Sequence, residues 1–286
     1  TDPRTGRHEV LPNPSRAGGE LYSLCSLDGI LWTFAYPQAY VSGYDPTRPW
    51  AFGDGPENNP RNFGTMGDGH LRPRAVIVGP DRNLYVGSYA DYGELGGAMG
   101  VFDPRAGKVV ESYRHLIRNQ SISALAYDPI SGMVFGGSDI AGGGGTSPSE
   151  KEAVFFAWDP VAKALRHQGV AVAGDTCTVA MAVAEGRVFV VTAPSQTLSV
   201  WDIAEARWLD HRRIPFGGVI PVALGRHSDG QIYGLTWRGV LQIDPTTMTV
   251  TQPARWKDGV HAGWVMNADG ITFVSGVRLV RWEWPR

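Results

Sequence analysis

A three-residue turn, a hydrophobic residue followed by aspartate and proline, recurs along this chain of 286 residues. The copies, the last of them degenerate, are Tyr44-Asp45-Pro46, Phe102-Asp103-Pro104, Trp158-Asp159-Pro160, Ile243-Asp244-Pro245 and Trp201-Asp202-Ile203. A second series of turns interleaves with the first, at Asp28-Gly29, Asp81-Arg82-Asn83, Ser131-Gly132, Glu185-Gly186, Asp229-Gly230 and Asp269-Gly270. Each turn of the second series separates two short apolar stretches, so the chain reads as repeated groups of short strands.

Internal repeats of about 40–50 residues, each with several short strands, are typical of a β-propeller. We therefore predict an all-β fold, a β-propeller of four-stranded blades that occupies residues 1–286 as a single domain. The composition agrees, because 37 glycines and 20 prolines suit many tight turns. The 10 tryptophans and 10 tyrosines suit packing between blades.

The repeat assigns every strand a place within its blade. Innermost strands are expected at residues 21–26, 74–79, 122–127, 178–183, 219–224 and 262–267. Second strands are expected at residues 31–36, 84–88, 133–137, 188–192, 232–236 and 272–275. Third strands are expected at residues 40–44, 99–102, 153–158, 198–201, 240–243 and 279–284, and outer strands at 108–113, 164–169, 207–213 and 249–252.

The six innermost strands predict six blades. The final blade reaches only its third strand, whereas residues 7–11 look like a strand that follows a turn. We expect residues 7–11 to close the ring by pairing with residues 279–284, which would remove an exposed sheet edge. The alternative is a ring of seven blades of which this chain is a fragment, with additional domains in the longer protein.

The charge and hydropathy of the chain bear on its partners. The net charge is −2 and the pI about 6.4, so the basic surplus typical of nucleic-acid binding is missing. No apolar run has the length of a membrane span, and the chain opens on polar and charged residues instead of a signal peptide. Cys25 and Cys177 lie in apolar segments, which favours buried thiols over a disulfide. The compartment stays open, with a secreted or periplasmic location favoured.

The longest loops fall on one face of the predicted ring, in the first three blades. They span residues 50–72, 88–97 and 139–148. Long loops on one face of a rigid scaffold are where binding sites are usually built. The glycine run 142–145 lacks the lysine and the helix of a phosphate-binding loop.

The densest functional candidate is the segment 67–74, which enters the second innermost strand. Arginine forks bind carboxylates bidentately, and a histidine or tyrosine beside them suits proton transfer. His70 and Tyr89 are the candidate catalytic residues. The candidate substrate-binding residues are Arg72, Arg74, Tyr40, Tyr92, Glu94 and Gln120.

A divalent cation in the central channel is a further hypothesis. Glu20, Asp175 and His261 each precede an innermost strand, as Gln120 does. If these side chains point inward, they form a ring of oxygen and nitrogen ligands. Solvated polar residues at strand ends are the alternative.

Several segments resemble known propellers. Residues 83–88 and 186–192 are similar to strands of bacterial-type β-propellers with YVTN-like or WD40-like repeats, and Trp158-Asp159 and Trp201-Asp202 match the WD40 Trp-Asp pair in part. Glu20 is similar to the first metal-binding glutamate of the gluconolactonase and regucalcin family, but the Pro-Asn-Gly motif of that family is absent.

A further resemblance is to propeller polysaccharide lyases, which use His, Tyr and Arg in a central cleft. The residues compatible with such a cleft are His70, Arg72, Arg74, Tyr89 and Tyr92. This resemblance implies a carbohydrate-active protein, a lyase acting on uronate-containing glycans, with an oligosaccharide or another small molecule as its ligand. The alternative is a non-catalytic propeller that binds a ligand or protein, as a sensor or scaffold module of a larger protein.

Overall fold

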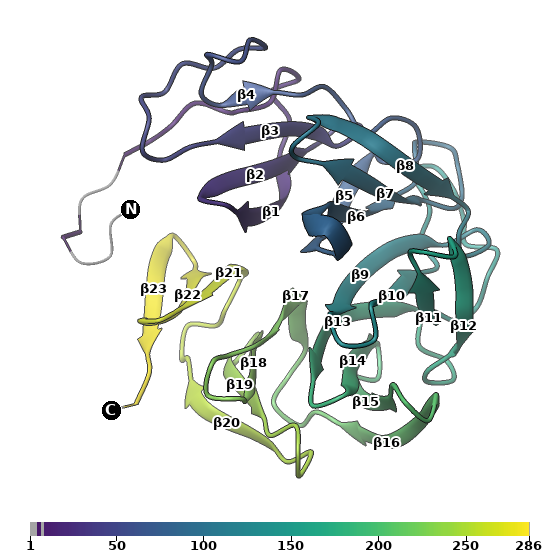
Figure 1. The fold of residues 1–286 in the computed structure, drawn as a ribbon. Coiled ribbons are helices and arrows are strands. Elements are labelled where there is room, and N and C mark those ends of the chain that lie inside the picture. Colours follow the sequence, from purple (N-terminus) through teal and green to yellow (C-terminus); the bar gives the residue numbers. More distant parts are fainter. Residues whose placement is uncertain (1–4, 7–8, 286) are drawn as a thin grey trace.

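The computed structural model describes residues 5–6 and 9–285. These residues form antiparallel strands arranged in a ring, as Figure 1 shows, so the prediction of an all-β, propeller-like fold is confirmed. Within the described part of the chain the helical structure is limited to one short 3-10 turn, η1 (Pro80–Arg82). None of its helices is long and apolar enough to cross a membrane.

Four small sheets make up most of the ring. The first contains β1 (Leu21–Leu27), β2 (Ile30–Ala35), β3 (Tyr40–Tyr44) and β4 (Arg61–Asn62). The second contains β5 (Arg72–Val78), β6 (Leu84–Tyr89), β7 (Ala98–Asp103) and β8 (Lys108–Arg114). Another contains β17 (Val219–Arg226), β18 (Ile232–Thr236), β19 (Gly239–Ile243) and β20 (Val250–Arg255), and the last contains β21 (Ala262–Asn267), β22 (Gly270–Ser275) and β23 (Arg278–Glu283).

A fifth, eight-stranded sheet fills the rest of the ring. Its first half is β9 (Ser121–Asp128), β10 (Met133–Asp139), β11 (Val154–Asp159) and β12 (Ala164–Val170). Its second half is β13 (Cys177–Ala184), β14 (Arg187–Ala193), β15 (Thr197–Asp202) and β16 (Arg207–Arg213). One residue pair, Asp139 with Cys177, joins the two halves.

The number of separate units differs from the prediction. Among the described residues the strands form four small sheets and one large one, not six or seven independent sheets. The cause is local: β10 runs two residues further than expected, to Asp139, and reaches the start of β13. A strand that ends at residue 137, as predicted, would not have made this contact.

The predicted closure of the ring is not seen where it can be tested. Glu9, Val10 and Leu11 form no strand, and Val10 is 90% exposed. Arg7 and His8 lie outside the described residues. Within the described chain β23 pairs only with β22, so the last sheet has three strands.

The Asp-Pro repeat is explained by turn chemistry. In each of the four copies with proline the aspartate carboxylate accepts a hydrogen bond from the backbone N–H two residues later, as Asp45 does from Thr47 and Asp103 from Arg105, both at 2.8 Å. Asp159 and Asp244 make the same bond at 2.9 and 2.8 Å. Such Asx turns order the link between third and fourth strands. The hydrogen bonds also hold the pKa of these carboxyls below the usual range.

Apolar side chains between adjacent sheets form the core. Trp32 of the first sheet packs on Phe102 of the second with ring centroids 5.5 Å apart. Tyr113 packs on Trp158 at 4.6 Å across the next interface. Because adjacent sheets cover both faces of the second strands, these strands are buried almost throughout, as in the pattern of β6. The core therefore holds the innermost strands around a common axis.

Residues 50–72, predicted to be one of the long loops on which a binding site is built, are not loop throughout. They contain the outer strand β4, which pairs with β3 at Ser42 and Gly43. The buried Asn59 fixes the preceding turn, because its amide nitrogen donates to the carbonyls of Asp45 and Arg48, both at 2.9 Å. Residues 50–62 therefore complete the first sheet by adding β4 to its edge.

Candidate functional site

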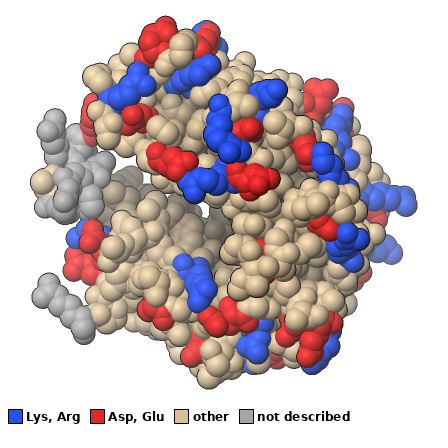
Figure 2. Space-filling view, in the orientation of Figure 1, with Lys and Arg blue, Asp and Glu red and all other residues tan. Residues whose placement is uncertain are grey.

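The innermost strands enclose a central channel of about 1010 Å³. Figure 2 shows the ring hollowed near its middle. The channel wall is largely apolar and includes Leu24, Ala75, Leu125, Met181 and Leu224. Ligand pockets are typically cavities of about 300–1,000 Å³ with apolar walls and a few placed polar groups. The polar groups therefore decide what this channel can bind.

A β-bulge near the start of each of the first four innermost strands selects the residue that faces the channel. The strand register shifts on either side of one extra residue in β1, β5, β9 and β13. A bulge leaves its extra residue unpaired and re-aims the side chain. The four extra residues are Tyr22, Arg74, Ser123 and Val179, and all four line the channel.

Arg74 lies between two tyrosine rings at the mouth of the channel. Its guanidinium carbon is 4.8 Å from the ring centroid of Tyr22 and 5.5 Å from that of Tyr89. Both distances are within the range of a cation–π contact. The side chain is exposed, and no salt bridge joins it to a carboxylate of the described residues. The tyrosines hold the cation in place and leave its hydrogen-bond donors free.

Arg72 forms a similar group farther out along β5. Its guanidinium is 5.3 Å from the ring of Tyr92 and 5.8 Å from that of Tyr36, and it donates to the Tyr92 hydroxyl at 3.2 Å. The hydroxyls of Tyr36 and Tyr92 are 3.1 Å apart. Tyr92 is 56% exposed, so this second arginine–tyrosine group faces solvent.

A hydrogen-bonded cluster of Tyr89, Asp139 and Cys177 lines the same end of the channel. The Tyr89 hydroxyl donates to the Asp139 carboxylate. Burial, and next the charge of Asp139, raise the pKa of Tyr89 and also that of the Cys177 thiol. Both groups therefore keep their protons at neutral pH. Protonated Tyr89 is suited to donating a hydrogen bond, but a pKa raised this far makes it a weak acid and leaves no phenolate to remove a proton.

His70 does not reach the channel, which corrects the prediction that it is catalytic. The imidazole is fully buried between Ser88 and Ser112, with Nδ1 2.8 Å from one hydroxyl oxygen and Nε2 3.1 Å from the other. Burial lowers the pKa of His70 to about 4. A neutral histidine with both nitrogens occupied is a structural residue of the second sheet.

Gln120 and Asp175 occupy the equivalent positions of the following units and make equivalent bonds. The Ser138 hydroxyl donates to the Gln120 amide oxygen, and the Thr192 hydroxyl donates to Asp175 at 2.5 Å. Both side chains are buried. The polar residue before each of these innermost strands therefore binds a hydroxyl group at the end of the second strand. The sequence pattern had suggested instead that such residues point inward and form a ring of ligands. Gln120 is thus not available to substrate in the channel.

The three proposed metal ligands are not brought together. Asp175 is buried in its own unit, as described above, and also accepts hydrogen bonds from the backbone N–H and hydroxyl of Ser195 at 2.9 and 2.5 Å. The ring nitrogen Nδ1 of His261 accepts from the N–H of Gly276 at 2.9 Å, and Glu20 is exposed. No group of three His, Cys, Asp or Glu side chains suited to a metal ion occurs in the described part of the chain.

Two other predicted substrate-binding residues also lie away from the channel lining. Tyr40 begins β3 and pairs with Ala35. Glu94 forms an ion pair with Arg114, which neutralises it. The loop of Glu94 packs against the glycine run of the third unit, because Gly143 N–H donates to the Glu94 carbonyl and Gly93 N–H to that of Gly144, both at 2.9 Å. These loops support the channel mouth without lining it.

Tyr22, Asp139 and Cys177 are site residues that sequence reasoning missed. The alignment of repeats contained a signal for Asp139, because it follows Gly137-Ser138 as Tyr89 follows Gly87-Ser88. Nothing in the sequence marked the bulge that turns Tyr22 inward.

The chain was also compared with known proteins. No protein-family model and no curated protein sequence matches this chain.

Proposed function

We propose that this protein is a ligand-binding propeller that captures an acidic sugar at the mouth of its channel. The observation that carries the proposal is Arg74, an exposed arginine without an ion pair in the described chain, held between the rings of Tyr22 and Tyr89. A guanidinium fork matches a planar carboxylate bidentately. The carboxylate of a uronate unit is the group we assign to Arg74.

The second arginine–tyrosine group extends this site to an oligosaccharide. Arg72, with Tyr36 and Tyr92, lies two residues from Arg74 on the same strand and carries the same combination of a cation and flat apolar rings. Aromatic side chains bury large flat surfaces at low entropic cost, which suits the faces of sugar rings. Two such groups in succession favour a ligand with at least two acidic sugars.

A lyase reaction is the second candidate. Tyr89 lies beside Arg74, which would neutralise the uronate carboxylate, but the raised pKa of Tyr89 makes it a weak acid for protonating a leaving oxygen. With His70 buried, no residue is assigned to remove the sugar proton that an elimination requires. We therefore place binding ahead of catalysis.

We also propose that the ring works as six units. The two halves of the eight-stranded sheet, β9–β12 and β13–β16, are each a four-stranded meander, and a single residue pair connects them. Counted in this way, each unit contributes one innermost strand to the channel.

Titration calorimetry with defined trisaccharides tests the proposal. We expect trigalacturonate to bind and the neutral maltotriose not to bind. Arg74→Gln should weaken the binding roughly tenfold or more, which corresponds to about 1.4 kcal/mol, whereas Arg213→Gln at an exposed strand end should not. Equal binding of both sugars, or an unchanged affinity of Arg74→Gln, would overturn it. Absorbance of an unsaturated product in the same mixtures would establish the lyase.

A further inference from the structure

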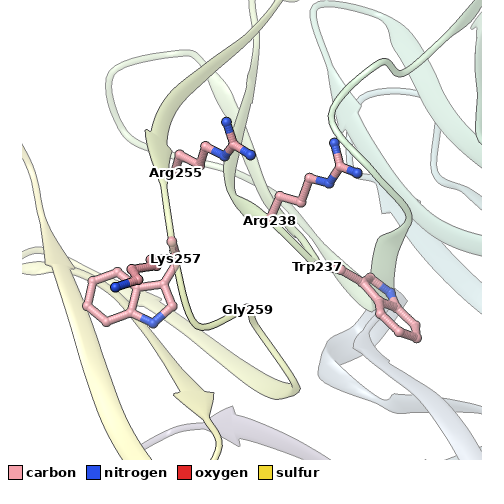
Figure 3. A pocket seen from close by; sticks show the side chains of 6 residues that line it. Trp237, Arg238, Arg255, Lys257 and Gly259 are labelled. Atoms are coloured by element: carbon pink, nitrogen blue, oxygen red, sulfur yellow. The ribbon is translucent and has the colours of Figure 1, made fainter.

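A second pocket lies outside the channel, on the sheet β17–β20 and the loop that leaves it. Its volume is about 440 Å³, and its lining residues are Trp237, Arg238, Arg255, Trp256, Lys257 and Gly259 (Figure 3). Of these six residues, three carry cationic side chains and two carry indoles, and none is acidic. Neither the proposed carboxylate site nor any motif of the sequence involves these residues.

The strand pairing explains why two arginines meet here. Arg238 ends the turn between β18 and β19, and Gly239 pairs with Arg255 at the end of β20. The N–H of Trp256 donates to the Arg238 carbonyl at 2.7 Å. Gly239 has φ +145°, and a Cβ there would overlap the carbonyl of Ala254, so glycine is required for this close approach. The backbone positions of the two arginines are consequently fixed beside each other, and Figure 3 shows their side chains extending in the same direction.

The charges of this pocket are uncompensated. Within the described chain, Arg238, Arg255 and Lys257 take part in no salt bridge. Two arginines of β16 and β17 behave differently, since Arg226 pairs with Glu185 at 2.7 Å and Arg212 with Asp210. Like charges on adjacent strands are destabilising. A bound anion with more than one negative charge would relieve that repulsion.

The two tryptophans give the pocket flat apolar walls. Trp237 is 64% exposed although its large indole would normally be covered. Gly218 lies beside the indole, since a Cβ at that position would be in van der Waals contact with its nitrogen at 3.4 Å. Trp256 is held by a hydrogen bond from its indole N–H to the Ser275 hydroxyl at 2.9 Å. The pocket thus combines one fixed indole, one exposed indole and three cations.

From these observations we infer a separate binding site for a multiply charged sugar ester, a sulfated or phosphorylated mono- or disaccharide. Its ester oxygens bind to Arg238, Arg255 and Lys257, and its ring packs against the indole of Trp237. A volume of about 440 Å³ is in the range of small-molecule sites. The pocket does not include Arg74, so this inference can be tested independently of the proposed function.

Calorimetry with four probes tests the inference. The probes are a trisulfated disaccharide, fructose 1,6-bisphosphate, inorganic phosphate and the neutral maltose. We expect at least one of the two esters to bind with one site per chain and maltose not to bind. The ester that binds more tightly shows whether the site takes a sulfated or a phosphorylated sugar. Raising the salt concentration should weaken the binding, because exposed charges are screened.

Variants locate the site. Arg238→Gln combined with Arg255→Gln should reduce ester affinity at least tenfold, and Trp237→Ala should reduce it severalfold while sparing inorganic phosphate. Arg213→Gln is the matched control, because Arg213 ends the neighbouring outer strand β16 and is exposed. Arg74→Gln should leave ester binding unchanged. Absence of ester binding in the wild type, an unchanged affinity in the double variant, or equal losses in Arg213→Gln would overturn the inference.

Discussion

The hydroxyl of Tyr89, at the end of β6, donates a hydrogen bond to the carboxylate of Asp139, at the end of β10. This bond connects two neighbouring sheets at the mouth of the channel. Asp139 also pairs with Cys177 of the next inner strand. Asp139, through its carboxylate and its backbone, therefore ties three successive parts of the ring together beside the proposed ligand site.

Removing the Tyr89 hydroxyl should destabilise the ring. Tyr89→Phe leaves the Asp139 carboxylate without this partner, and a hydrogen bond to a charged group contributes about 1.5–3 kcal/mol. We expect the melting temperature to fall by several degrees in calorimetry. Tyr92→Phe removes a hydroxyl from an exposed ring and serves as the control. Equal melting temperatures of the two variants would show that the Tyr89–Asp139 bond contributes little.

Both cysteines should react slowly in the folded protein. Burial raises the pKa of Cys25 to about 11 and raises that of Cys177 as well, with Asp139 as a further cause. Since the thiolate is the reactive form, iodoacetamide at about pH 8 should label neither thiol readily before denaturation. Asp139→Asn should accelerate labelling of Cys177 but not of Cys25, as mass spectrometry of peptides can measure. Rapid labelling of Cys177 in the wild type would be inconsistent with its protonated state.

The buried His70 should make stability depend on pH. Unfolded histidine binds a proton near pH 6.5, whereas the native residue does so only near pH 4. Between these values the unfolded state holds more protons, so stability should decrease as the pH is lowered from 6.5 to 4. The shift corresponds to about 3 kcal/mol.

Urea unfolding across that pH range measures this contribution. His70→Gln should flatten the dependence between pH 4 and 6.5, while His261→Asn, at an exposed position, should leave it unchanged. A wild-type protein whose stability is constant across this range would contradict the buried neutral state of His70.

The propeller-like fold was predictable because its signals are local. The Asp-Pro copies mark Asx turns that need only their own neighbours, as Asp45 and Thr47 illustrate. The merging of β9–β16 was not predictable, because it depends on one pair between strands distant in sequence, Asp139 and Cys177. Residues 50–72 looked like a loop because their strand, β4, has only two residues.

The candidate site was predictable in part. Arg72, Arg74 and Tyr89 were identified from their place before and after strands, and they do lie near one another. His70 was misplaced because sequence position cannot tell whether a side chain at a strand entrance points to the channel or into the sheet. Its partner Ser112 is 42 residues away, on the outer strand β8.

The position of a bound ligand is the most direct test of the central claim. A crystal of the protein soaked with trigalacturonate should be analysed for electron density at the channel mouth. Our account predicts a uronate carboxylate within hydrogen-bonding distance of Arg74, with its sugar ring against Tyr22 or Tyr89. Sugar bound only elsewhere, with Arg74 unchanged between its two tyrosines, would contradict the account.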